Sequence, residues 1–245
     1  MDFLLKEQYS MEDLLEIVRI LRAPGGCPWD QEQTHQSIRA NFIEETYEAI
    51  EAIDTNDLVL LQEELGDVLL QILLHTQMEA EHGGFTFADV VDGIAKKLIV
   101  RHPHVFGETV VKDSAEVLSN WDEIKKQTKD QKTQTQVLRS VSPALPALMR
   151  SAKVQKKACK AGEVLPASPQ AALQAVEQHV QQVRQAVEHP EGNVQKAVGD
   201  LLFSVVNVAR TLTLEPEHTL NLACDRFIDA FEAWEQKTHG RNGND

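Results

Sequence analysis

Two pairs of acidic residues stand at helical spacing in the first third of the chain. Glu45 and Glu48 are three residues apart, and so are Glu64 and Asp67. Residues three apart share a face of an α-helix, so each helix presents two carboxylates side by side. Four converging carboxylates repel one another unless cations hold them, and hard divalent ions such as Mg²⁺ prefer oxygen ligands. The spacing therefore predicts a Mg²⁺ site formed by these four residues.

The elements that must position these acids are two consecutive helices. The polar segment 54–57 between them is short enough to make them antiparallel neighbours. The second acidic pair lies in segment 58–74, which is otherwise rich in Leu, Val and Ile. We predict a core stripe there, with the acids beside it, made of Leu61, Leu65, Val68 and Ile72. Acids next to a core need partners or a metal, whereas the plainer alternative is a solvated acidic face.

The acidic pattern resembles the signature of the MazG family of nucleoside triphosphate pyrophosphohydrolases. It reads Glu44-Glu45-x-x-Glu48 and then, after fifteen residues, Glu64-x-x-Asp67. The flanking motifs that share this resemblance are Gly25-Gly26-Cys27-Pro28-Trp29-Asp30, Glu45-Thr46-Tyr47-Glu48, Arg101-His102-Pro103-His104-Val105-Phe106-Gly107 and Trp121-x-x-Ile124-Lys125. The resemblance covers most of the chain. It implies an all-α fold of tandem helical bundles and Mg²⁺-dependent hydrolysis of nucleoside triphosphates to the monophosphate and pyrophosphate.

Basic residues further along the chain are candidates for binding the polyphosphate. Lys97 and Arg101 are four residues apart and share a helix face. This face is either a solvated basic edge or a phosphate-binding site. The resemblance favours the phosphate-binding site, and it also implies that Trp121 and Lys125 close over the nucleotide. Asn41, one turn before Glu45, is a further candidate nucleotide contact.

Two acids next to the predicted ligands are candidates for the general base that activates water. Glu44 is turned about 100° from its neighbour Glu45, and Glu63 is its rival beside Glu64. Trp29 is open to two interpretations, a core residue or a wall for a base, because aromatic side chains serve both purposes. His102 and His104 are interpreted as loop residues rather than ligands.

Composition narrows the class of protein. The 245 residues carry a formal net charge of −14, which argues against binding a nucleic-acid polymer but leaves room for a nucleotide site with metal ions. Cys27, Cys159 and Cys224 have no paired spacing and indicate reduced thiols of a cytoplasmic protein. The longest apolar run contains Glu63, Glu64 and Asp67, so no membrane-spanning helix is expected.

Helix signals divide the chain into two halves. We expect helices to begin after Ser10, near Thr34 or His35, at Leu58, after Thr86 and at Ser114, with Val90, Val91, Ile94 and Leu98 as the apolar stripe of the fourth. Segment 129–142 is polar, lacks an apolar period and is predicted to be a linker. The predicted domains are a catalytic domain at 1–128, a second helical domain at 143–240 and a tail at 241–245.

The second half is predicted to be a copy of the first that has lost its acids. Aligning Asp200 with Asp67 places Ala197 at the position of Glu64. The same alignment, through a slightly shorter loop, places Gln182 and Gln185 where Glu45 and Glu48 stand, Arg226 at Lys97 and Ala230 at Arg101. Glutamine and alanine are poor ligands for Mg²⁺. Catalysis is therefore expected in the first half only; the alternative is that the two halves are merely similar amphipathic helices.

Two other classes of protein remain as alternatives. A di-iron bundle protein would need Glu-x-x-His pairs, but the second members here are Glu48 and Asp67. A non-enzymatic regulator would sense nucleotides or dock on another protein, which the sequence does not identify. We expect a homodimer, because MazG relatives pair and because a small helical domain with an exposed apolar stripe gains from pairing.

Overall fold

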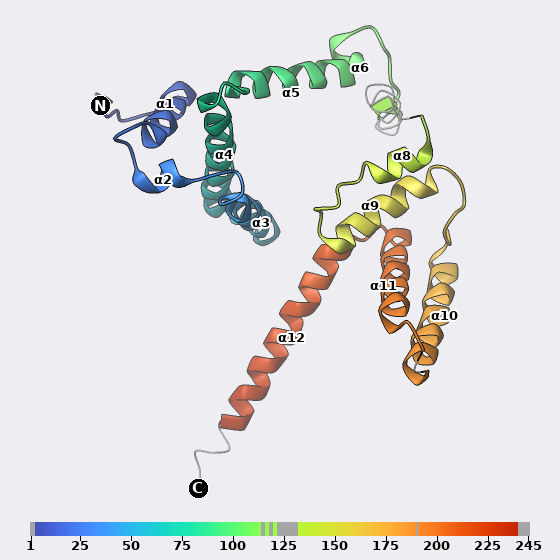
Figure 1. Cartoon of the computed structure of the whole chain (residues 1–245). Helices are drawn as coiled ribbons and strands as arrows, with labels where there is room; N and C mark the ends of the chain where they lie inside the picture. The colour runs from blue at the N-terminus through green and yellow to red at the C-terminus, as the bar shows by residue number, and fades with distance from the viewer. Residues whose placement is uncertain (1–2, 114–115, 118–119, 122–131, 190, 240–245) are drawn as a thin grey trace. The chain divides into compact units, whose positions relative to one another are not determined.

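The computed structural model describes residues 3–113, 116–117, 120–121, 132–189 and 191–239, and these residues form helices joined by loops and turns, without strands (Figure 1). The chain divides into two compact units, residues 1–121 and 122–245. The all-α class predicted from the sequence is confirmed. The finer domain boundaries at 128, 142 and 240 stay predictions.

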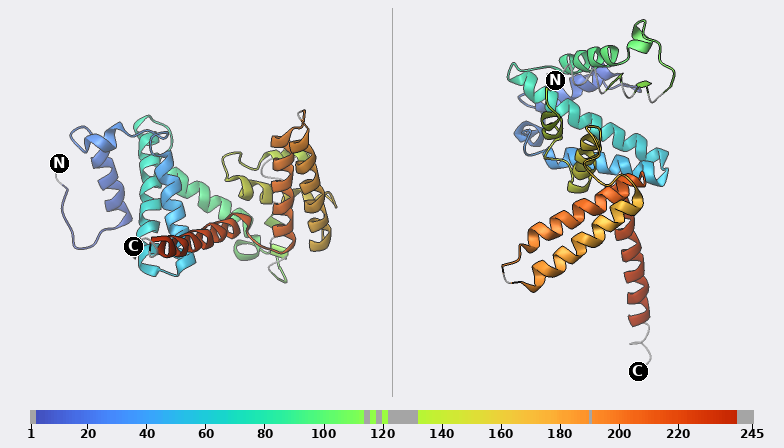
Figure 2. Two further views of the ribbon diagram at one scale, coloured as in Figure 1. Left: turned by 90° about the horizontal axis from the view of Figure 1, so that it is seen from below. Right: turned by 90° about the vertical axis from the view of Figure 1, so that its right-hand side faces the viewer.

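The first unit is built around an antiparallel helix pair. Its helices in order are α1 (Met11–Arg22), α2 (Pro28–Glu32), α3 (Arg39–Thr55), α4 (Leu58–Glu81), α5 (Phe87–Arg101) and α6 (Pro103–Phe106). Helix α3 ends at Asn56, whose left-handed backbone (φ 57°) reverses the chain, and the Asp57 side chain then caps α4. The two helices lie side by side in both views of Figure 2, as the short polar break predicts.

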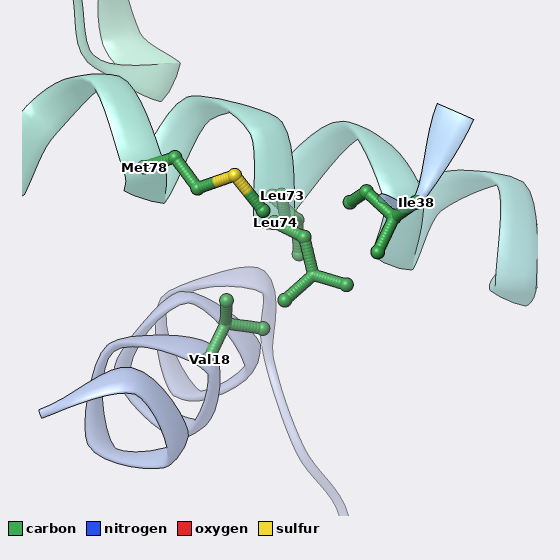
Figure 3. Packing of buried hydrophobic residues seen from close by; sticks show 5 residues of the cluster. All are labelled: Val18, Ile38, Leu73, Leu74 and Met78. Atoms are coloured by element: carbon green, nitrogen blue, oxygen red, sulfur yellow. The ribbon is translucent and has the colours of Figure 1, made fainter. Parts of the chain in front are cut away.

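The core of this unit gathers residues from α1, α4 and the segment before α3. Its buried members are Val18, Ile38, Leu73, Leu74 and Met78, which meet in Figure 3. Ile38 and Leu73 are each 1% exposed, so the loop that leads into α3 is held against α4 by apolar packing. This contact fixes where α3 begins relative to α4.

Three details differ from the sequence-based expectations. Helix α3 begins at Arg39 rather than near Thr34, because Thr34 and Ser37 form a turn in which each backbone N–H donates to the other's hydroxyl. Of the predicted core stripe on α4, Leu65 is 55% exposed and the other three residues are half-buried, whereas Glu64, Gln71, Leu74 and Met78 are buried. The expected helix at 114–128 falls largely outside the described residues.

The second unit repeats the order of the first. It contains α8 (Gln134–Arg139), α9 (Ala147–Cys159), α10 (Pro169–Glu188), α11 (Val194–Thr211) and α12 (Pro216–His239). Helices α10 and α11 pair as α3 and α4 do, α9 packs on α11, and α12 follows as α5 follows α4. Helix α8 lies inside the segment predicted to be a linker. The Thr133–Gln136 capping box defines the N-terminus of this helix, and its Val137 is buried.

Membrane crossing finds little support in the helices that the structure describes. None of them alone combines the length and the apolar character for a span; only the sharply bent pair Val194–Thr211 and Pro216–Thr238 meets those criteria jointly.

Candidate metal and nucleotide site

The paired helices α3 and α4 bring three of the four predicted metal ligands to one point. One carboxylate oxygen from each of Glu45, Glu48 and Glu64 lies within 4.8 Å of the others. Glu45 and Glu48 come from successive turns of α3, and Glu64 faces them from α4. Asp67 is close enough to raise the pKa of both Glu45 and Glu64 by charge repulsion, which places it beside the group.

The electrostatics of this cluster fit a site that binds a cation. Burial raises the pKa of Glu64, and repulsion from Glu48 and Asp67 raises it further. Burial likewise raises the pKa of Glu45, with repulsion from Asp67 and Glu48 adding to it. In the part of the chain that the structure describes, no lysine or arginine pairs with these carboxylates.

Glu64 carries the clearest sign of a missing partner. Its side chain lies on the buried face of α4, the residue is 8% exposed, and Oε2 has no hydrogen-bond partner among the described residues. A buried carboxylate oxygen without a donor is costly, and a divalent cation would satisfy it. The donor set is entirely carboxylate oxygen, which fits Mg²⁺ and does not fit a soft metal.

The other candidate residues near the acidic cluster differ in how far they are exposed to solvent. Glu44 and Glu63 are exposed, and each repels the carboxylate that follows it in the chain, so both border the cluster. Asn41 is half-buried one turn before Glu45. Trp29 is 56% exposed, which rules out the core interpretation that the sequence left open.

The basic residues on α5 are not brought to the acidic cluster within this unit. Figure 1 shows α5 leaving the C-terminal end of α4 and running away from the α3–α4 pair. Glu64 is 17 residues before Glu81 at that end, a distance of about 25 Å along the helix axis. Lys97 is exposed and Arg101 half-buried towards the far end of α5.

Trp121 is held near the end of α5 by an aromatic contact. Its ring meets His102 edge to face, with 4.8 Å between centroids, and its Nε1 is buried without a hydrogen-bond partner in the described residues. His102 ends α5 and His104 lies in α6, so neither joins the acidic cluster. Lys125 lies outside the described residues.

A polar cluster that the sequence does not predict fixes the loop before α3. His35 Nδ1 and His75 Nδ1 are 2.7 Å apart, and His35 Nε2 is 2.8 Å from Glu79 Oε1. The spacing of four between His75 and Glu79 indicates that these two residues share a face of α4. It does not identify their partner, because His35 comes from a turn with no helical period.

In the second unit the acid that remains pairs with a lysine of its own helix. Ala197 is buried at the position aligned with Glu64, and Gln182 and Gln185 are exposed. Lys196 Nζ lies 2.5 Å from Asp200 Oδ2, the one acid that remains. That hydrogen bond lowers the pKa of Asp200, and the positive charge of Lys196 also favours its ionised form. An internal ammonium thus neutralises the carboxylate.

Comparisons with known proteins agree with this geometry. The model of the MazG nucleotide pyrophosphohydrolase domain matches residues 33–106, which contain the whole acidic cluster. The chain is 38% identical to the nucleoside triphosphate pyrophosphohydrolase/pyrophosphatase MazG of Thermotoga maritima over 225 residues, 92% of this chain and 85% of that protein. It is also 38% identical to the nucleoside triphosphate pyrophosphohydrolase of Escherichia coli K12 over 231 residues, 93% of this chain and 88% of that protein.

A third relative is longer than this chain. The chain is 44% identical to the uncharacterized protein YabN of Bacillus subtilis over 221 residues, 90% of this chain but 45% of that protein. The two relatives that it covers almost in full show that the chain belongs to the MazG nucleotide pyrophosphohydrolase family.

Proposed function

We propose that this chain hydrolyses nucleoside triphosphates to the monophosphate and pyrophosphate, in a Mg²⁺-dependent reaction confined to its first repeat. The observation that carries the proposal is the meeting of Glu45, Glu48 and Glu64 within 4.8 Å around an unsatisfied buried oxygen. Relatives that the chain covers almost fully carry the name of this activity.

Glu45, Glu48, Glu64 and Asp67 would hold the ion. When bound, Mg²⁺ polarises phosphoryl oxygens and lowers the pKa of a coordinated water. Glu44 or Glu63, exposed at the border of the cluster, accepts the proton of the attacking water. The water oxygen forms a bond to the α-phosphorus, the bond from that phosphorus to the bridging oxygen breaks, and pyrophosphate leaves with the electron pair.

Lys97, Arg101 and Lys125 would neutralise the charge of the leaving pyrophosphate, and Asn41 and Trp121 would contact the nucleoside. Because α5 carries its basic residues away from the acidic cluster of its own chain, we propose a homodimer in which the second copy supplies them. Every residue from Ala88 to Val100 is exposed on α5, so the helix has a face free for such a partner. The three free thiols support a cytoplasmic location.

The test is pyrophosphate release from a panel of nucleoside triphosphates with Mg²⁺. Glu48→Gln removes one ligand charge, and Asp200→Asn makes the matched change in the second repeat. We expect the first variant to lose activity and the second to keep most of it. Equal losses would contradict a single active repeat, and nucleotide binding without pyrophosphate release would favour the non-enzymatic regulator.

A further inference from the structure

The two repeats contain clefts at corresponding places, each lined by the inner helix (α4 or α11), a helix that packs on it (α1 or α9) and the start of the helix that follows it (α5 or α12). In the first repeat it is lined by α1, α4 and the start of α5, with a volume of about 380 Å³. In the second it is lined by α9, the end of α11 and the start of α12, with a volume of about 770 Å³. The cleft has therefore been kept and enlarged in the repeat that lacks the acidic cluster.

Several lining residues of the two clefts occupy corresponding positions along the helices. Val18 on α1 and Gln155 on α9 are the most buried residues of their helices, at 1% and 0% exposure. Aligning them places Glu16 at Lys153 and Arg19 at Lys156. The offset that aligns Asp67 with Asp200 places Gln77 at Arg210 and Ala80 at Thr213, and all eight of these residues line their clefts (Glu16, Arg19, Gln77, Ala80, Lys153, Lys156, Arg210, Thr213).

The charge of the cleft differs sharply between the repeats. In the first repeat Arg19 is the one cationic residue among those that line the cleft. It donates two hydrogen bonds to Glu16, at 2.6 and 2.7 Å, so its charge is neutralised. In the second, Lys153 and Lys156 are exposed and make no ion pair with any described residue. Residues three apart share a helix face, so both ammonium groups reach the same cleft.

Arg210 adds a third cation that is held in place. Its Nε donates to Asn207 Oδ1 at 2.8 Å and its Nη2 donates to the Pro166 carbonyl at 3.0 Å. Asn207 is itself 3% exposed and donates to the same carbonyl. A guanidinium fixed in this way loses little freedom when it binds a ligand.

The single carboxylate of the cleft already has a partner. Glu215 Oε2 accepts a hydrogen bond from the backbone N–H of His218 at 2.6 Å, in the first turn of α12. The cleft thus presents three cationic side chains against one engaged acid, in a chain whose formal net charge is −14.

We propose that the cleft of the second repeat is a binding site for a small oligophosphate. Two flexible ammonium groups and a fixed guanidinium that line one cleft match a ligand with several adjacent anionic oxygens. The volume of about 770 Å³ admits a ligand of pyrophosphate to nucleotide size. On this proposal the second repeat lacks the metal site of the first and carries an anion site at the end of its inner helix α11, and this site needs no metal.

The test is calorimetric titration of the full chain with inorganic pyrophosphate, in EDTA and at low ionic strength, so that the metal-dependent site stays silent. The cleft variant carries Lys153→Gln and Lys156→Gln. The matched control carries Arg139→Gln and Arg150→Gln, two exposed cations of the same unit that do not line the cleft. We expect saturable binding that weakens roughly tenfold or more in the cleft variant and less than about threefold in the control.

Inorganic phosphate serves as the comparison ligand. Pyrophosphate binding more tightly than phosphate supports recognition of an oligophosphate, whereas equal affinities overturn it. Equal weakening in the cleft and control variants would show a general charge effect and refute the site. Unchanged pyrophosphate binding in the cleft variant would also refute it.

Discussion

Arg22 is predicted to be a main stabilising residue of the first unit. Its Nε and Nη2 donate to the two carboxylate oxygens of Glu81, each at 2.9 Å, and its Nη1 donates to the carbonyls of Asp30 and Gln33. The arginine thereby ties the end of α1 to the end of α4 and to the segment that leads to α3. Replacement by methionine keeps the length of the side chain and removes all four hydrogen bonds.

The expected loss follows from the burial of the pair. Breaking a buried ion pair costs about 3–5 kcal/mol, and an exposed pair is worth less than about 1 kcal/mol. The Arg22 side chain is 6% exposed and that of Glu81 is 29% exposed, so an intermediate loss of about 2–3 kcal/mol is expected for Arg22→Met. For a unit of this size that is a fall of roughly 6–15 °C in its Tm.

The loss should depend on pH in a defined direction. Burial raises the pKa of Glu81, but the hydrogen bonds from Arg22 and Gln77 and the charge of Arg22 outweigh it and lower the pKa from its ordinary value of 4.5. A carboxylate with a lowered folded-state pKa stabilises the protein above its unfolded-state value, and that stability is lost as the pH falls through the folded-state value. The difference between wild type and Arg22→Met is therefore full at pH 7 and shrinks in acid.

The assay is thermal and urea unfolding of wild type, Arg22→Met, Glu81→Gln and the control Arg19→Met. Arg19 pairs with Glu16 within the same helix and both side chains are about half exposed, so its loss should change little. Arg22→Met should cost more than Glu81→Gln, because only the former also releases two backbone carbonyls. Equal costs for these two variants, or a loss no larger than that of the control, would refute the reasoning.

Two further predictions concern the site and the assembly. Glu64→Gln should raise the Tm of the metal-free protein at neutral pH and reduce the further rise in Tm that Mg²⁺ produces, as measured by differential scanning fluorimetry with EDTA or Mg²⁺. Because the pKa of Glu64 is raised, the stability that its carboxyl group contributes is present in acid and lost as the pH rises. The Tm difference between variant and wild type should therefore vanish near pH 4. Ile94→Asp on the exposed face of α5 should convert a dimer to a folded monomer by light scattering, and a monomeric wild type would contradict the pairing.

Helical spacing alone was enough to predict most of the acidic site. The pattern of Glu45, Glu48 and Glu64 requires only that two helices pair across a short turn, and local signals at Asn56 and Asp57 secure that turn. Such local constraints are readable because each residue acts on its neighbours in the chain.

The buried face of α4 could not be read in the same way. Leu, Val and Ile occur on nearly every side of this helix, so its periodicity does not decide which side packs; the contacts with α1 and Ile38 decide it. Leu65 is exposed and Glu64 buried as a result. The contacts of His35 with His75 and of Arg22 with Glu81 join residues 40 and 59 positions apart, and nothing in the local sequence predicts them.

The lysine beside Asp200 has a consequence for any attempt to rebuild a metal centre in the second repeat. Restoring glutamates at Gln182, Gln185 and Ala197 would place them around a carboxylate that Lys196 already neutralises. A tethered ammonium competes with a dissolved ion through a fixed effective concentration, which the ion must exceed to displace it. A rebuilt centre in this repeat is therefore expected to bind its ion more tightly when Lys196 is replaced together with the return of the acids.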